Sequence, residues 1–337
     1  MRVGATPGKL GLAGVLLLVF AAVLLWLLPS DTYIFLPDRA RPVDPLITVQ
    51  GGHKIRGARG IYFVDIFVRK ATLIERLFPS IHEGAQLVPA SSVLPKGVSE
   101  TARQNADKRE MTRSQEVAAA VALRAAGYHV VARPTGALIQ QVAGDAPAAG
   151  KLQPTDVVTA ADGRRVRGPA GLRRIVESHK PGDTVRLTIH RGSQLKQIVV
   201  GTVADSAHPG HALIGVFVDQ AAFIKLPITV KINAGSIGGP SAGLAFALDV
   251  LEELGRNVDH GHRIAATGQI ELDGTVSAVG GVEQKTIGVR RSGIDVFLVP
   301  AGDNAAEARR YAHGLRIVPV HSFRQALLAL ATLPKTG

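Results

Sequence analysis

One glycine-rich segment has the composition expected around a catalytic serine. It runs from Asn233 to Gly243 with the sequence NAGSIGGPSAG and leads into a predicted apolar helix over 241–254. Glycines let backbone N–H groups approach a ligand closely. Unpaired amides at a helix start carry positive partial charge, which stabilises a developing oxyanion. Ser241 is therefore the candidate nucleophile, although a serine in this position can also serve only as a helix cap.

A serine hydroxyl becomes a good nucleophile only when a base accepts its proton. Residues 239–243 satisfy the GxSxG pattern of α/β-hydrolases, and acids and histidines follow in the expected order: Asp295, Asp303, His313 and His321. In that fold, however, the serine lies on a sharp turn directly after a strand. Here eight residues separate Ile232, at the end of a predicted strand, from Ser241, and a proline lies in the turn. An esterase of that class is therefore the less favoured prediction.

Lysine is the alternative base, because burial and nearby positive potential lower its pKa from about 10.4. Lys285 lies near the first turn of a helix predicted over 282–291, where the helix dipole disfavours an ammonium group. Apolar neighbours that can desolvate the amine are Val279, Val282 and Ile287. The sequence thus predicts a Ser241–Lys285 pair.

Four motifs occur in a fixed order in this part of the chain: GPSAG (239–243), ATGQI (266–270), DGTVSAVGGVEQK (273–285) and GIDVFLVP (293–300). Together they resemble the proteolytic domain of Lon-type proteases. The resemblance implies that Ser241 is the nucleophile and that Lys285 is the general base, which later protonates the leaving amine. It implies that Thr267 helps to orient the lysine amine. The sequence has Val-Glu-Gln at 282–284 where the family usually has Leu-Lys-Glu, but Lys285 is kept.

Other candidate sites are weaker. The chain has no GxxxxGK[ST] phosphate-binding loop, so we predict no ATPase engine and no cofactor. His260 and His262 have no third ligand in sight, and we predict no metal. Asp249 and Glu253, one turn apart on the predicted 241–254 helix, are expected at solvated positions.

Residues 10–28 form an uncharged apolar stretch. A bilayer core of about 30 Å needs about 20 such residues in a helix, and the apolar region of a cleaved signal peptide is shorter. We therefore predict a retained transmembrane helix. Arg2 and Lys9 precede the stretch and Asp31 follows it, which places residues 1–9 in the cytoplasm and the rest of the chain outside the cell membrane.

Residues 31–134 show no chemistry. The pattern predicts a strand over 61–68 and a helix over 116–126, with Thr112 and Gln115 as a capping box and Gly127 at its end. The charged residues 108–110 are expected to form a solvated face.

Residues 135–205 contain predicted strands over 137–142, 156–161, 184–190 and 197–203, a short turn-rich helix over 146–153 and a helix over 171–179. This order and the words TGAL (135–138), DAPAAGKL (145–152) and DVVTAADG (156–163) resemble a PDZ domain. The resemblance implies that an extended peptide pairs with the strand from Ala137. Its carboxylate would sit on backbone N–H groups of a turn formed by Thr135, Gly136, Ala137 and Leu138. The alternative is that this sheet only packs against its neighbours.

The composition bounds the remaining classes. The 337 residues include no Cys, which excludes disulfides and a thiol nucleophile. The net charge is +12, but aromatic residues make up only 4% and no basic stripe appears, so we expect no nucleic-acid partner.

The predicted fold is a multidomain α+β protein with an N-terminal transmembrane helix, a PDZ-like β-rich domain and a Lon-type α/β protease domain over 208–337. The domain order resembles membrane-anchored, ATP-independent Lon-like proteases. Flexible or unfolded polypeptides are the expected substrates, and a homo-oligomer stays an open option. The rival hypothesis is a membrane-tethered peptide-binding scaffold with an inactive Lon-like domain.

Overall fold

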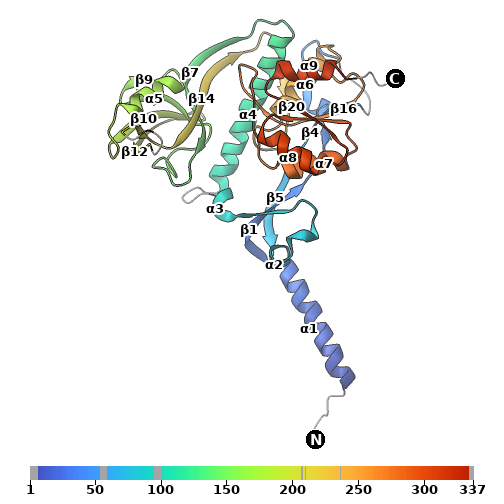
Figure 1. The fold of residues 1–337 in the computed structure, drawn as a ribbon. Coiled ribbons are helices and arrows are strands. Elements are labelled where there is room, and N and C mark those ends of the chain that lie inside the picture. Colours follow the sequence, from blue (N-terminus) through green and yellow to red (C-terminus); the bar gives the residue numbers. More distant parts are fainter. Residues whose placement is uncertain are drawn as a thin grey trace.

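The computed structural model describes residues 7–53, 59–94, 100–205, 208, 210–235 and 237–333. Most of the predicted cytoplasmic residues 1–9, and Ser236 within the glycine-rich segment, lie outside this description. Figure 1 shows two lobes on either side of a long helix, α4 (Glu100–Ala125), and a separate helix, α1 (Pro7–Leu27), that projects from the base of the molecule.

Helix α1 carries exposed apolar side chains, among them Leu12, Phe20 and Trp26. In helix α1 the side chains of residues 7–11, 13 and 21 lie outside the description. Among the side chains that are described, no helix provides an apolar stretch long enough to span a bilayer. A small antiparallel sheet with the order β5-β1-β6 follows α1. Its strands are β1 (Pro29–Pro37), β5 (Ile66–Thr72) and β6 (Gln86–Pro89), and the short helices beside it are α2 (Leu73–Leu77) and α3 (Ala90–Val93).

Two predictions for residues 31–134 are corrected by the structure. Helix α4 already includes residues from Glu100 onward, so Thr112 lies inside the helix and donates its hydroxyl to the carbonyl of Lys108 rather than capping a helix end. The predicted strand over 61–68 is two strands in different sheets, β4 (Gly60–Phe63) and β5. The helix does end before Gly127, which has a positive φ of 90°.

The lobe that contains Ser241 is built on a five-stranded sheet with the order β2-β4-β16-β19-β20. The last four strands are parallel and β2 is antiparallel. Alternate residues of each parallel strand enter two different cores, as Phe297 and Leu298 of β19 do. A parallel sheet that is covered on both faces requires such continuous apolar strands. The strands are β2 (Arg41–Pro42), β4, β16 (Arg263–Ala266), β19 (Val296–Pro300) and β20 (Arg316–Val320).

Helices α4, α6 (Gly243–Glu253) and α9 (Phe323–Ala331) pack on one face of this sheet, and α7 (Val282–Arg291) and α8 (Asp303–Tyr311) pack on the other. Strands from residues 41–63 and from residues 263–320 share the sheet. The predicted segments 31–134 and 208–337 therefore build one lobe together. Two small ladders complete it, β15 (Val230–Ile232) with β3 (Ile47–Val49) and β17 (Gln269–Ile270) with β18 (Val276–Ser277).

The second lobe contains an antiparallel sheet with the order β11-β10-β8-β7-β14 and the helix α5 (Pro169–Glu177). Its core includes Ile139, Leu172, Leu187 and Ile189. The predicted helix over 146–153 is a series of turns instead. The strands are β7 (Val131–Val142), β8 (Val157–Ala161), β9 (Arg164–Arg165), β10 (Thr184–Arg191), β11 (Gln194–Gly201) and β14 (Val216–Lys225), and β12 (Val203–Ala204) pairs with β13 (Ala212–Leu213).

Candidate active site

Ser241 lies near the end of the glycine-rich segment, two residues before the start of helix α6. The helix begins at Gly243, its N-cap is Ala242, and no side chain caps it. The reading of Ser241 as a helix cap is therefore wrong, and its side chain is left for another role. The residue is half-buried, so the hydroxyl lies near the surface of the lobe.

The backbone of Ser241 is hydrogen-bonded to the segment that follows strand β16. The Ser241 carbonyl accepts hydrogen bonds from the Gly268 amide (2.8 Å) and from the Thr267 hydroxyl (3.2 Å). The Leu244 amide donates in return to the Gly268 carbonyl at 3.1 Å. A Cβ at Gly268 would lie 2.6 Å from Val276, so the close contact needs glycine. Thr267 is fully buried.

Lys285 is the fourth residue of α7, and only 2% of its surface is exposed. Its Nζ donates to the Thr267 hydroxyl at 3.3 Å. Burial lowers the pKa of the amine from 10.5 to about 8, while the negative charge of Asp65 opposes that change. Gly281 turns the chain into α7 with a positive φ of 68°, and a Cβ there would lie 2.9 Å from Ile66.

Thr267 is the bridge between the two predicted catalytic residues. Its hydroxyl accepts from Lys285 and donates to the Ser241 carbonyl. In the part of the chain that the structure describes, the Ser241 hydroxyl and the Lys285 amine form no direct hydrogen bond. Two hydrogen bonds of the Thr267 hydroxyl therefore link the Lys285 amine to the backbone carbonyl of Ser241.

Asp65 is a site residue that our reading of the sequence missed. It follows β4, as Thr267 follows the neighbouring parallel strand β16, so both lie at the carboxyl edge of the central sheet. Ligands and catalytic groups gather at such an edge. Burial raises the pKa of Asp65, and the Ile66 amide donates to its carboxylate at 2.8 Å. Its position after a buried apolar strand was the available signal.

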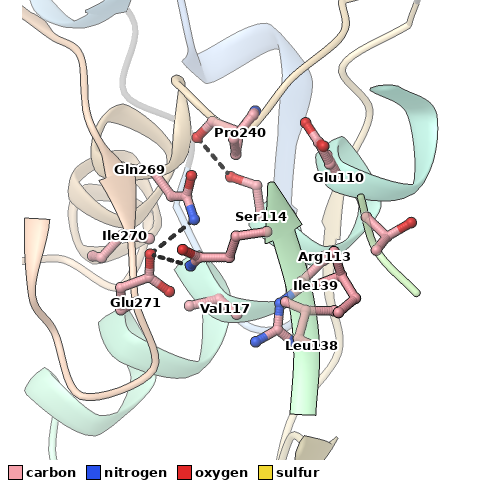
Figure 2. Close-up of a pocket in the computed structure, with 12 residues that line it drawn as sticks. Glu110, Arg113, Ser114, Val117, Leu138, Ile139, Pro240, Gln269, Ile270 and Glu271 are labelled. Atoms are coloured by element: carbon pink, nitrogen blue, oxygen red, sulfur yellow. Dashed lines mark hydrogen bonds between the residues drawn. The ribbon is translucent and has the colours of Figure 1, made fainter. Parts of the chain in front are cut away.

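A small pocket of about 70 Å³ lies beside the nucleophile segment, between α4, β7 and β17 (Figure 2). Glu271 lines this pocket and accepts hydrogen bonds from Gln269 (2.8 Å), Ser277 (3.2 Å) and Gln140 (3.3 Å). Burial and the nearby carboxylate of Asp219 raise the pKa of Glu271 to about 7.

Glu110 also lines this pocket, and burial raises its pKa to about 7. The prediction that residues 108–110 form a solvated face is therefore wrong at Glu110.

The predicted peptide site is not arranged as expected. Residues Thr135, Gly136, Ala137 and Leu138 do not form a turn, because they lie inside β7. Strand β8 pairs with β7 on one side, and β14 pairs with it over ten residues on the other, from Val216 opposite Val142 to Lys225 opposite Val131. Gly136 allows β7 to lie close to β8, because a Cβ at this position would lie 2.4 Å from the Val158 carbonyl oxygen. The chain itself thus occupies the side of β7 that faces away from β8.

The predicted solvation of Asp249 and Glu253 is also wrong. Helix α6 is covered on all sides, and the two residues are only 3% and 2% exposed. The Val49 amide donates to the Glu253 carboxylate at 2.9 Å, so this side chain links α6 to strand β3. A buried carboxylate requires such partners.

Comparison with known proteins assigns two parts of the chain. Residues 105–202 match the family model of the PDZ domain, and residues 189–330 match that of the Lon protease (S16) C-terminal proteolytic domain. The chain is similar to the PDZ domain of the SdrC-like protein from Listeria monocytogenes, with 28% identity, 25% of this chain and 87% of that chain covered, and a TM-score of 0.24.

Curated relatives also match part of the chain. Lon protease from Desulforamulus reducens is 34% identical over 35% of this chain and 16% of its own length. Lon protease 1 from Sorangium cellulosum is 39% identical over 37% of this chain and 15% of its own length. The chain thus spans about a sixth of these relatives. Together the matches make the chain similar to a PDZ domain in one part and to the proteolytic domain of Lon proteases in another, which supports a PDZ-containing, Lon-like protease.

Proposed function

We propose that this protein is an ATP-independent, membrane-anchored serine endopeptidase that uses a Ser241–Lys285 dyad. The observation that carries the proposal is the buried Lys285 amine, held at 3.3 Å by Thr267, whose hydroxyl also holds the carbonyl of Ser241. A desolvated amine with a pKa of about 8 is neutral in a substantial fraction of molecules near pH 7.5, and only the neutral amine can accept a proton.

The reaction follows from these groups. This mechanism requires the Ser241 hydroxyl to come within hydrogen-bond distance of the amine, which removes the proton as the oxygen attacks the scissile carbonyl carbon. The protonated Lys285 then delivers that proton to the leaving amine as the C–N bond breaks, and an acyl-enzyme remains. Water attacks the acyl-enzyme with the neutral amine again as base, which releases the new carboxylate and restores the serine.

The test uses the purified full chain and an unfolded model protein without ATP. We expect cleavage by the parent and losses of at least about 10³-fold in Ser241→Ala and Lys285→Ala. His321→Ala, a change in a histidine that an esterase mechanism would need, is the matched control and should keep activity. If the parent and both dyad variants behave alike, the inactive-scaffold alternative is the correct one.

The membrane anchor is the second part of this proposal. Its support is the uncharged stretch of residues 10–28 and the exposed apolar side chains of α1. In this proposal residues 1–9 face the cytoplasm and both lobes lie outside the membrane. Alkaline carbonate should leave the full chain in the membrane pellet and release a chain that starts at Ser30. Release of both chains would contradict the anchor.

The PDZ-like lobe, in this proposal, presents flexible polypeptide tails to the dyad. Support comes from the PDZ match and from β14, whose outer edge has no strand partner among the described residues and carries exposed Phe217 and Phe223. A photo-reactive phenylalanine analogue at either position should crosslink a substrate tail. The same analogue at Phe78, which is exposed beside α2, is the control and should not. Equal crosslinking at all three positions would contradict tail docking on this edge.

A further inference from the structure

The two peptide groups that flank the nucleophile are each held by a hydroxyl from another element. The Ser241 carbonyl accepts from Thr267, as described above. The Pro240 carbonyl accepts from the hydroxyl of Ser114 at 3.2 Å and from the Gly243 amide at 3.2 Å. Figure 2 shows Ser114 below Pro240, with the hydrogen bond drawn between them.

A planar trans peptide points its N–H opposite to its C=O. Holding the Pro240 carbonyl therefore fixes the direction of the Ser241 N–H, and holding the Ser241 carbonyl fixes that of the Ala242 N–H. Neither of these two amides donates a hydrogen bond within the described ranges of the chain. Two fixed, unused N–H groups at the nucleophile are what an oxyanion requires.

Ser114 is built into this arrangement. It lies in the middle of α4, is only 3% exposed, and belongs to a part of the chain outside residues 189–330. A Cβ at position 243 would lie 2.8 Å from its hydroxyl oxygen, so the glycine leaves room for the serine to reach the loop. The same helix touches the loop a second time, where the Gly239 amide donates to the Asp107 carbonyl at 3.4 Å.

We propose that Ser114 is a positioning residue, whose hydroxyl orients the Pro240–Ser241 peptide so that the Ser241 N–H is presented to the oxyanion of the tetrahedral intermediate. This inference rests on the proposed peptidase function. Ser114 acts through Pro240 and exchanges no proton with the substrate. Through Ser114, helix α4 would therefore contribute to the rate of the reaction.

The change Ser114→Ala is a clean test, because the Pro240 carbonyl keeps the Gly243 amide as a donor and is not left unpaired. A direct oxyanion donor contributes about 10²–10³ in kcat, so loss of one of two supports should cost about 10-fold. The KM should stay within about two-fold, because the ground state does not use the oxyanion contact. The pH at which activity is half-maximal should not move, since Lys285 is untouched.

Two further variants separate positioning from general damage. Ser114→Thr keeps a hydroxyl and should restore most of the kcat. Thr112→Ala removes an exposed hydroxyl that bonds only within α4, and it should behave as the parent. A second measurement does not require that a threonine side chain fits at the buried position 114. A peptide boronate, which forms a tetrahedral adduct with a serine, should bind Ser114→Ala about 10-fold more weakly, while the matching product peptide should bind equally well.

Each outcome discriminates. If Ser114→Ala keeps the kcat and boronate affinity of an active parent, Ser114 has no positioning role, although the peptidase function stands. If kcat falls together with product-peptide affinity, the hydroxyl supports the fold rather than the oxyanion, and the inference is also wrong. If the parent itself neither cleaves the unfolded protein nor binds the boronate, the proposed function fails.

Discussion

The Nζ of Lys285 lies 3.3 Å from the Oγ1 of Thr267, and both side chains are buried. This contact joins the first turn of α7 to the end of β16, and the same hydroxyl donates to the carbonyl of the candidate nucleophile. A buried amine with one hydroxyl partner has lost most of its hydration, so its charged form is disfavoured. Four expectations follow from this relationship and from the carboxylate nearby.

The rate should depend on pH through the lysine. The amine acts as a base only when neutral, and its pKa is about 8, so kcat/KM should rise about 10-fold per pH unit below 8 and level off above it. The measurement is a pH–rate profile from pH 6 to 10. A midpoint near 6.5, or activity that falls as pH rises through 8, would point to a histidine or another group as the base.

Replacing the lysine by an apolar residue of similar length should stabilise the fold while it abolishes activity. The amine has a lower pKa when folded than when unfolded, so the unfolded chain binds more protons between about pH 8 and 10.5, and stability rises with pH in that window. At pH 7 the burial penalty is therefore fully present. We expect Lys285→Met to raise the free energy of unfolding by about 2 kcal/mol at pH 7.

The control for that measurement is Lys231→Met, at an exposed position of β15, which should leave stability nearly unchanged. Denaturant titrations at pH 7 and pH 10 check both variants. The gain from Lys285→Met should shrink at pH 10, and a gain that is equal at the two pH values would show that its origin is not the buried charge.

Removing the charge of Asp65 should move the pH profile to lower pH. Its carboxylate raises the pKa of Lys285, so Asp65→Asn should lower that pKa and enlarge the neutral fraction near pH 7. The midpoint of the profile is the quantity to measure. Asp273→Asn, in the turn before β18, is the control and should leave the midpoint in place. An unchanged or raised midpoint in Asp65→Asn would mean that the two side chains are not electrostatically linked.

The Thr267 hydroxyl should matter more than the shape of the residue. Thr267→Val keeps the volume but leaves the buried amine without its partner, and we expect kcat to fall by about 10²-fold. Thr267→Ser keeps the hydroxyl and should retain most of the activity. Steady-state kinetics of the two variants decide the matter, and equal activities would exclude a role for the hydroxyl.

Local sequence patterns predicted much of the site. Helix α7 covers the predicted range 282–291, and Lys285 lies in its first turn as expected. Ser241 does lie beside the start of a helix. These features depend on neighbours within one or two turns, so the sequence contains them directly.

Features that depend on distant contacts were not predicted. Asp65 and Lys285 are 220 positions apart in the sequence. The parallel pairing of β4 with β16 places Asp65 at the same edge of the sheet as Thr267, whose hydroxyl holds the Lys285 amine. Glu253 was expected in water because its spacing on α6 is that of a surface pair, yet α4 and the sheet cover the helix. Strand β14 was not recognised as the neighbour of β7, since nothing local specifies which sheet an apolar run joins.

Because β14 and β8 occupy both sides of β7, a tail that paired with β7, rather than with the outer edge of β14, would compete with β14 for that strand. A tail that pairs with β7 must first release ten residues of the chain's own backbone, which is present at a high effective concentration because it is covalently attached. Only 15 residues separate the end of β14 from Ser241. An exchange of strands in the PDZ-like lobe would therefore lengthen the free connection leading to the nucleophile, so recruitment and catalysis would compete for the same stretch of polypeptide.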